Sequence, residues 1–404
     1  MKVVSVTRSV PYDGIPHAGG EYYLRHVRAL IDLGHEVHVI APRTPENEAA
    51  VQRHPGLTVY LYGDGDLIPQ TRAERLHVRA VPAAVIRRDR RAFERDVKIA
   101  TILEDADIVE YQWTQSAYLS KGVAPSGGSR PQKFALLHDI MTQQITRQLD
   151  SSGSNVSLRL QRLVKLFTTR RIEKYVCTHM DHVLVFSSKD AAFVRSFAPT
   201  VPVSVIPPPL VRSMPFDPAE RLRRVSATSF KVLFVGFFRR SENVLAALWL
   251  LEEIWPRLRA AVPYAELVIA GAEPTPAMCE AASSDRSISV TGYVDDLGPY
   301  YRSADAVVIP LLMGAGVKFK TIDALLEGVP VVTTSVGAEG ITQDLSVFWK
   351  VSDDASDIAA ALAEVARRPD DALKLALTSR DWAQDHFSEE KFRSRLAQIF
   401  RERK

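Results

Sequence analysis

The sequence predicts an α/β protein built from two parallel-sheet domains that face a central cleft. At 404 residues the chain exceeds the roughly 250–300 residues at which a single hydrophobic core stops growing, so two domains are expected. Short apolar segments alternate with longer amphipathic ones, and this alternation runs twice along the chain. Several short segments, such as His35–Ala41, are almost continuously apolar, which is typical of strands buried on both faces of a parallel sheet.

The first series begins with a strand at Val3–Thr7, a glycine-bearing loop, and a helix over residues 21–33 that Gly34 ends. Two arginine-rich stretches, residues 72–104 and 156–176, are predicted to be long helical stretches. Further strands of this series are expected at residues 57–62, 108–111, 133–138, 183–187 and 203–206.

Three consecutive prolines, Pro207–Pro209, separate the two series, because proline continues neither a strand nor a helix. We expect a semi-rigid linker there, between a domain of residues 1–209 and a second of residues 210–385, with a last helix in residues 386–404. The second series has strands expected at residues 231–235, 266–270, 288–291, 306–311 and 329–334. In open sheets of this kind a ligand binds beyond the carboxyl ends of the strands.

Composition and charge exclude several classes of protein. The formal net charge is only +3, far from that of a strongly basic nucleic-acid-binding domain. No run of about 18 apolar residues predicts a membrane-spanning helix, and the N-terminus reads as a first strand rather than a signal peptide. The two cysteines, Cys177 and Cys279, lack metal-ligand spacing, so a reducing, cytoplasmic setting is expected.

The most informative segment runs from Pro310 to Thr334. Its pattern predicts a strand, a loop of small residues, a helix and another strand. The small residues Gly314–Gly316 let a ligand approach the backbone closely. The unpaired N–H groups at the start of the helix, together with the positive end of its dipole, suit a diphosphate.

Lys318 and Lys320 add positive charge at the start of this helix. Because they are two residues apart they point to different faces, and at most one is expected to reach the phosphates. Asp323, one turn beyond Lys320, could accept hydrogen bonds from ribose hydroxyls. The alternative is a plain helix with a surface pair of Lys320 and Asp323, and the residues alone leave both open.

The segment resembles the nucleotide-sugar motif of the GT-B retaining glycosyltransferases of the family-4 type. Short motifs on both sides extend the resemblance in order, so that it covers most of the chain although each motif alone is weak. In the second half they are Val235-Gly236, Asn243, Trp255-Pro256, Ile269–Gly271, Thr291–Asp296, Ser303–Asp305 and Gly337–Gly340. In the first half they are Ala18–Glu21, Leu33–Val37, Leu137–Asp139 and Ser187-Ser188.

The resemblance implies two Rossmann-like domains, the first for the acceptor and the second for the nucleotide sugar, with the last helix packing back on the first domain. It implies that His138 is the catalytic residue, in contact with the donor sugar or its phosphate. By their residue types alone, His138 could be a structural histidine, and Gly19-Gly20 an ordinary turn between strand and helix. The residues expected to bind the donor are Gly19, Gly20, Gly236, Arg239, Arg240, Val294, Gly314, Ala315, Gly316, Val317, Lys318, Lys320 and Asp323.

The chain departs from the family pattern in two places. Where the family often has two glutamates eight positions apart, this chain has Ala315 and Asp323, and the aspartate is one methylene shorter. The usual basic pair after the first strand of the second domain is also not clear. Arg239 and Arg240 are the nearest candidates, while Glu242 stands near the position of the usual lysine. We therefore expect the donor phosphates to depend on the helix N-terminus and on a lysine of the motif.

The resemblance also implies hexosyl-type transfer with retention, from a nucleotide diphosphate to an acceptor hydroxyl, without a metal or other cofactor. Catalysis would then rest on positioning and on electrostatic stabilisation of the departing diphosphate. Asp64-Gly65-Asp66 matches the letters of a metal motif, but it lies in the half expected to bind the acceptor. Two alternatives stay open: a non-catalytic nucleotide-binding partner of an active homologue, and a nucleotide-sugar epimerase on the same fold.

The predicted helix at residues 156–176 is basic and amphipathic. Its apolar side consists of Leu160, Leu163, Val164 and Phe167. Its basic residues, Arg159, Arg162, Lys165, Arg170, Arg171 and Lys174, are opposed by one acid, Glu173. Such a helix can lie on an anionic membrane surface, here the inner face of the membrane; the alternative is the solvated face of a packed helix.

Overall fold

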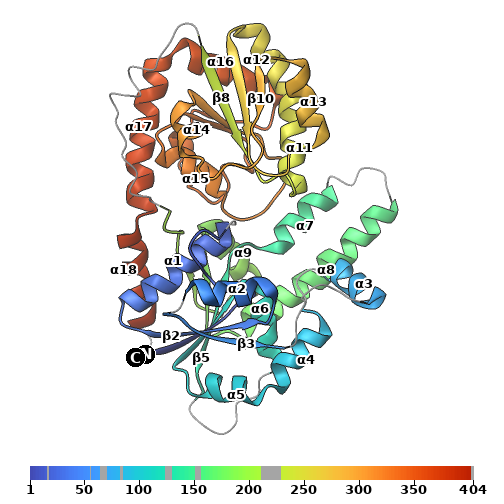
Figure 1. The fold of residues 1–404 in the computed structure, drawn as a ribbon, viewed down its shortest axis with the longest axis vertical. Coiled ribbons are helices and arrows are strands. Elements are labelled where there is room, and N and C mark those ends of the chain that lie inside the picture. Colours follow the sequence, from blue (N-terminus) through green and yellow to red (C-terminus); the bar gives the residue numbers. More distant parts are fainter. Residues whose placement is uncertain are drawn as a thin grey trace. The chain divides into compact units, whose positions relative to one another are not determined.

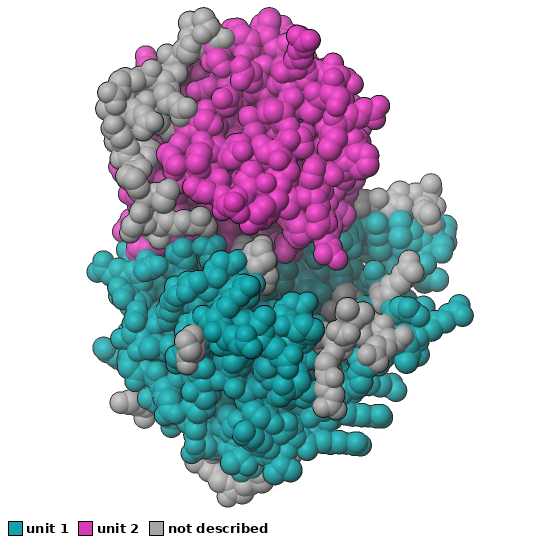
Figure 2. Space-filling model, in the orientation of Figure 1, with its two compact units in different colours: residues 1–209, 389–404 teal, residues 210–388 magenta. Residues whose placement is uncertain are grey.

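In a computed structural model of the chain, the described residues are 1–15, 18–54, 56–63, 71–81, 85–122, 130–150, 156–210 and 229–401. Strands of two parallel sheets are each flanked by helices (Figure 1). The chain divides into two compact units, which Figure 2 shows in different colours. Unit 1 comprises Met1–Pro209 and Glu389–Lys404, and unit 2 comprises Leu210–Ser388. The predicted fold class, α/β with two parallel sheets, is confirmed.

Unit 1 contains a seven-stranded sheet in the order β3-β2-β1-β4-β5-β6-β7, and all of its strand pairs are parallel. The order reverses direction between β1 and β4, where Val3 pairs with Val37 on one side and with Ile108 on the other. The strands are β1 (Lys2–Val6), β2 (Glu36–Pro42), β3 (Thr58–Tyr62), β4 (Ile108–Gln112), β5 (Gln132–Leu137), β6 (His182–Val185) and β7 (Val203–Val205).

The helices of unit 1 are α1 (Ala18–Asp32), α2 (Pro45–Arg53), α3 (Arg72–Ala80), α4 (Arg87–Arg95), α5 (Val97–Glu104), α6 (Trp113–Leu119), α7 (Met141–Asp150), α8 (Val156–Thr178), α9 (Ser188–Phe197) and α18 (Glu389–Arg401). The described residues of the helical stretch predicted at 72–104 form three helices, α3, α4 and α5. The last break has a local cause: Asp96 caps α5 by accepting hydrogen bonds from the backbone N–H groups of Lys98 and Ile99. The C-terminal helix α18 packs on α1, where the Phe392 ring meets Tyr22 and His26.

Unit 2 contains a six-stranded parallel sheet in the order β10-β9-β8-β11-β12-β13, which reverses direction between β8 and β11. Its strands are β8 (Phe230–Val235), β9 (Ala265–Ala270), β10 (Ile288–Val290), β11 (Ala306–Ile309), β12 (Val331–Thr333) and β13 (Lys350–Val351). Its helices are α11 (Ser241–Trp249), α12 (Trp255–Ala261), α13 (Pro276–Ser284), α14 (Gly298–Ser303), α15 (Phe319–Leu326), α16 (Ala355–Arg367) and α17 (Pro369–His386). A π-helical turn, Leu250–Ile254, joins α11 to α12.

The core of each unit comes from the apolar strand residues that the sequence singled out. Val4, Val6 and Val109 are fully buried in unit 1, and Val232 and Val308 are fully buried in unit 2. Among the described residues, no helix is both long enough and apolar enough to cross a membrane.

Candidate functional site

Both sheets reverse their strand order at a point where ligands bind in open α/β sheets, beyond the carboxyl ends of the strands. In unit 2 this point lies between β8 and β11, so Gly236 and the loop that contains Gly314 are the segments that follow it. In unit 1 it lies between β1 and β4, and the segments that follow lead to Gly19 and Trp113.

In unit 2, the loop between β11 and α15 turns through two glycines in conformations that other residues rarely adopt. Gly314 has a φ of 128° and Gly316 a φ of 70°. A Cβ atom at Gly314 would lie 3.4 Å from Cε of Lys318, so the loop folds back over this lysine. The small residues of the motif are thus needed to bring the loop backbone against the start of α15.

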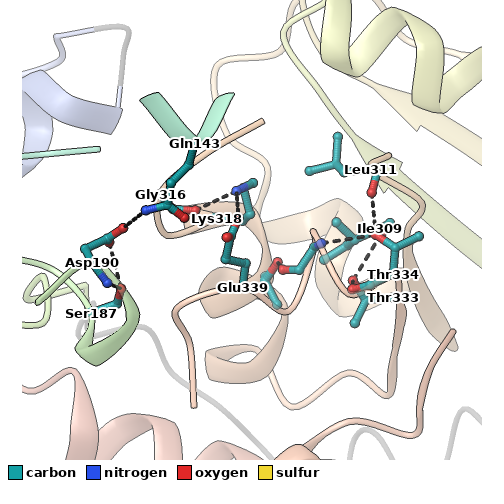
Figure 3. A network of polar contacts seen from close by, with 12 residues as sticks. Gln143, Ser187, Asp190, Ile309, Leu311, Gly316, Lys318, Thr333, Thr334 and Glu339 are labelled. Atoms are coloured by element: carbon teal, nitrogen blue, oxygen red, sulfur yellow. Dashed lines mark hydrogen bonds and ion pairs between the residues drawn. The ribbon is translucent and has the colours of Figure 1, made fainter. Parts of the chain in front are cut away.

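The amino group of Lys318 is held inside this loop (Figure 3). Nζ donates to the carbonyl of Gly316 at 2.5 Å and lies 3.6 Å from Oε2 of Glu339. Both side chains are largely buried, with exposed fractions of 10% for Lys318 and 4% for Glu339. The sequence analysis included Glu339 only as part of the motif Gly337–Gly340 and did not predict that it would pair with Lys318. The feature that could have indicated this role is an acidic residue in a glycine-rich segment that follows a buried strand.

Buried threonines fix the two loops relative to the sheet (Figure 3). The Thr334 hydroxyl donates to the carbonyl of Leu311 at 2.5 Å and accepts from the N–H of Gly337 at 3.1 Å. Thr321 of α15 donates to the carbonyl of Gly337 at 2.8 Å. The end of β11, the start of α15 and the Gly337–Gly340 segment therefore form one hydrogen-bonded frame.

Lys320 points elsewhere, as the two-residue spacing predicted. Its Nζ donates to Oδ1 of Asn243 at 2.7 Å and lies 5.1 Å from the centre of the Phe234 ring. Burial lowers the pKa of Lys320 to about 7, although Glu242 acts in the opposite direction. Asn243 thus holds Lys320, whereas the role of Asp323 in ribose binding stays a prediction.

The remaining predicted donor residues of unit 2 lie at different distances from this frame. Gly236 is buried at the end of β8, where a Cβ atom would lie 3.3 Å from Cβ of Asn243. Arg239 and Arg240 follow it and are exposed. Val294 comes after β10, and β9 and β8 separate that strand from β11. The structure thus groups Gly236 with Asn243 and Lys320, and places Val294 after a more distant strand.

In unit 1, His138 follows β5 and its ring is held on several sides. Nε2 lies 3.1 Å from Oε1 of Gln112, and the ring stacks on Trp113 with centroids 4.2 Å apart. Tyr22 and Phe186 contact the ring at centroid distances of 5.2 and 5.1 Å.

Two of the predicted residues of unit 1 come together here. In the first turn of α1, a Cβ atom on Gly19 would lie 3.4 Å from Nδ1 of His138 and 3.3 Å from the Trp113 ring. Gly20, the next residue, is buried. The structure therefore places Gly19 directly against the predicted catalytic histidine.

The residues around His138 include several that the sequence reasoning missed. Gln112 and Glu110 lie in β4, whose five residues are all buried. His26 of α1 is fully buried against Glu110. Trp113 has a φ of 67°, a strained conformation for a residue other than glycine. The available signal was the alternation Glu110-Tyr111-Gln112, because polar side chains are unusual in a strand buried on both faces.

The Asp64-Gly65-Asp66 triplet lies outside the described residues.

Comparison with known proteins identifies relatives of both sequence and fold. Residues 229–368 match the profile of the family described as "Glycosyl transferases group 1". The chain is 21% identical over 409 residues to the "Uncharacterized 44.6 kDa protein in cps region" of Klebsiella pneumoniae, with 99% of each chain covered. The solved structure of sucrose-phosphate synthase from Thermosynechococcus elongatus superimposes with a TM-score of 0.73 at 17% identity, covering 100% of this chain and 99% of that one. HepE of Anabaena in complex with UDP-glucose gives a TM-score of 0.65 at 12% identity, with 100% of both chains covered. These likenesses confirm the GT-B fold that the sequence motifs predicted.

Proposed function

We propose that this chain, whose residues 229–368 match the group 1 glycosyl transferases, moves a sugar from a nucleotide diphosphate to an acceptor hydroxyl with retention of the anomeric configuration. The observation that carries the proposal is the frame in unit 2, where the glycine loop meets the start of α15 at the strand-order reversal. Such a helix start offers N–H groups and a positive dipole to a diphosphate.

The donor contacts follow from this frame. Gly314–Val317 would carry the diphosphate at backbone level, and at most one of Lys318 and Lys320 would add positive charge at the phosphates. Asp323, on α15, would accept hydrogen bonds from the ribose. Gly236, Arg239, Arg240 and Val294 complete the proposed donor set of unit 2, and Gly19 and Gly20 that of unit 1.

The chemistry requires little covalent participation by the protein. The protein has two tasks. It stabilises the charge that develops on the departing diphosphate, which is an electrostatic effect, and it orients the acceptor hydroxyl, which is a geometric one. His138 is proposed to act at the transferred sugar. Lysine and helix N–H groups supply the positive charge that a metal supplies in other enzymes, so we propose metal-independent transfer, of hexosyl type.

Uridine is the base that we propose for the donor. The support is that HepE, a protein of the same fold, was solved in complex with UDP-glucose. At 12% identity this likeness extends to the fold alone, so the base is the first feature to measure.

Thermal unfolding with UDP, GDP, ADP and TDP, each with and without magnesium, tests the donor site. A nucleotide at 100 times its dissociation constant stabilises the protein by about 2.7 kcal/mol, which a melting curve resolves. We expect a shift with UDP that is independent of magnesium and is reduced in Asp323→Ala. The matched control is Asp381→Ala on α17, whose side chain is 80% exposed and which should shift like wild type.

Either of two outcomes would count against the proposal. No shift with any of the four nucleotides would favour a non-catalytic relative that has lost donor binding. A shift that requires magnesium would refute metal-independent binding.

We further propose that the protein works in the cytoplasm and contacts the inner face of the membrane through α8. The support is that the apolar side of this helix is exposed: Leu160 and Phe167 have exposed fractions of 62% and 64%. Leu163 and Val164 are also exposed, as are Arg159, Arg170, Arg171 and Lys174 beside them. An exposed apolar side flanked by cations matches an anionic lipid surface.

A further inference from the structure

Polar side chains lie in the most buried part of unit 1. The strand β4 has β1 on one side and β5 on the other, and all five of its residues are buried. Nevertheless it contains Glu110, which has an exposed fraction of 1%, and Gln112, which has none. A carboxylate at such a depth is costly unless it is fully hydrogen-bonded, so its partners indicate what it does.

Glu110 is surrounded by donors. It accepts hydrogen bonds from Oγ of Ser5 at 2.6 Å and from Nε2 of Gln112 at 3.1 Å, and its other oxygen lies 2.8 Å from Nε2 of His26. The hydroxyl of Tyr23 donates to Oγ of Ser5 at 2.8 Å, and this leaves the Ser5 proton for the hydrogen bond to Glu110. Burial acts to raise the pKa of Glu110, but His26 and these hydrogen bonds outweigh it and hold that pKa below its usual range.

The charge on Glu110 fixes the orientation of the next side chain. An ionised carboxylate only accepts hydrogen bonds, so the amide NH2 of Gln112 must face Glu110. The amide oxygen of Gln112 then faces His138, at 3.1 Å from Nε2. Because that oxygen only accepts, Nε2 of His138 must carry the proton, and the lone pair of the neutral ring is on Nδ1.

The ring of His138 has little freedom to escape this arrangement. Trp113 stacks on it at an interplanar angle of 25°, and Tyr22 meets it edge-on at 84°. Trp113 holds this position with a φ of 67°, and such backbone strain persists only where the surroundings over-determine the conformation. Nδ1 is directed at the first turn of α1, beside Gly19.

We propose that Gln112 and Glu110 are positioning residues that hold His138 in the Nε2–H tautomer and present Nδ1 as a hydrogen-bond acceptor beside Gly19. Nδ1 then has the lone pair, so while the ring is neutral it can accept a hydrogen bond but cannot donate to a phosphate oxygen. The role of this nitrogen toward the sugar rests on the proposed function, whereas the tautomer does not.

Nitrogen NMR of the full-length protein, labelled with 15N in its histidines, measures the tautomer directly. Long-range proton–nitrogen spectra distinguish a protonated ring nitrogen from one with a lone pair, and His138→Gln assigns the signal. At a pH where the ring is neutral we expect a protonated Nε2 and an unprotonated Nδ1. A protonated Nδ1 in the wild-type protein would overturn the proposal without any variant.

Two substitutions test the residues that set the tautomer. Gln112→Leu removes the acceptor, so the ring should become a mixture of both tautomers. In Glu110→Gln a neutral amide replaces the carboxylate and can both donate and accept, so the amide of Gln112 is no longer held in one orientation and both tautomers of His138 should appear. The control is Gln115→Leu on α6, whose amide contacts Met141 and which should leave the signal unchanged.

The outcomes separate the two proposals. A pure Nε2–H signal in folded Gln112→Leu would overturn the assignment of Gln112. If that variant does not fold, Glu110→Gln and the wild-type spectrum still decide. Nucleotide binding, measured by melting curves, reports on the proposed function independently, because the tautomer is observed without any ligand.

Discussion

At the scale of single residues, two lysines of one motif have different electrostatic roles. Lys318 is paired with Glu339 and with a loop carbonyl, so its charge is compensated within the loop frame. Lys320 contacts a neutral amide, Asn243, and burial lowers the pKa of Lys320 to about 7. Near neutral pH, therefore, Lys320 is only partly protonated, and a bound anion can increase its protonated fraction.

We expect diphosphate binding to depend on the protonation of Lys320. An anion beside Nζ favours the ammonium form, so the pKa of Lys320 rises on binding and the complex takes up a proton above pH 7. The dissociation constant for UDP should then increase with pH between 7 and 9, by at most about tenfold per unit. Calorimetric titration of the wild-type protein and Lys320→Met over this range measures the difference in slope.

Two comparisons make this measurement specific. Ionisation of UDP itself adds the same slope in every variant, so only the difference between proteins counts. Lys350→Met, at an exposed lysine of β13, should keep the wild-type slope. An unchanged slope in Lys320→Met would show that Lys320 does not contact the phosphates.

At the scale of elements, α8 carries a carboxyl group that caps α7. Oε1 and Oε2 of Glu173 lie 3.4 and 3.3 Å from the N–H of Thr142, and Oε2 also accepts from the Thr142 hydroxyl. Burial raises the pKa of Glu173 from 4.5 to about 7, although the hydrogen bonds from Thr142 act to lower it. α7 begins at Met141, three residues after His138, so this cap lies close in sequence to the predicted catalytic position.

Glu173 should make unit 1 less stable as pH rises from 4.5 toward 7. A carboxyl with a raised pKa binds more protons in the folded state, so its contribution is present below pH 4.5 and is lost as pH rises through 7. Relative to wild type, Glu173→Gln should gain free energy of unfolding across this window, at most about 1.4 kcal/mol per pH unit. Melting curves at pH 5, 6, 7 and 8 measure the trend, and Glu280→Gln, at an exposed carboxyl, should show none. A difference that does not vary with pH would refute the assigned titration.

The elements also show how far the sequence alone could be read. Apolar runs predicted the central strands of both sheets, because a strand buried on two faces has no polar face to obscure its pattern. The break of residues 72–104 into three helices was missed, since it depends partly on a side-chain cap at Asp96. The partners of Glu110 were missed because Ser5, His26 and Gln112 meet only after β1, α1 and β4 have packed together.

At the scale of the whole molecule, charge is distributed unevenly along the chain. Residues 1–209 hold 27 Lys and Arg against 21 Asp and Glu, whereas residues 210–404 hold 24 against 27. Much of the excess in the first half comes from α8, and the structure shows that the apolar side chains of its N-terminal part are exposed instead of packed. Its C-terminal part is anchored by buried Ile172, Val176 and Cys177. One helix thus belongs to the core at one end and to the surface at the other.

Membrane contact through α8 predicts binding that depends on both charge and apolar area. Vesicles that contain acidic phospholipid should bind the protein, vesicles of neutral phosphatidylcholine should bind it weakly, and raising the salt from about 0.1 to 1 M should release it as the Debye length falls from about 10 to 3 Å. Phe167→Ser and Leu160→Ser should each weaken binding up to about tenfold, since burial of a large apolar side chain contributes about 1.5–3 kcal/mol when complete. Leu345→Ser, at a leucine of unit 2 that is 51% exposed, should bind like wild type. Co-sedimentation measures all of these proteins side by side. If none of them binds acidic vesicles at low salt, or if the two α8 variants bind as well as wild type, the exposed side of α8 does not contact the membrane.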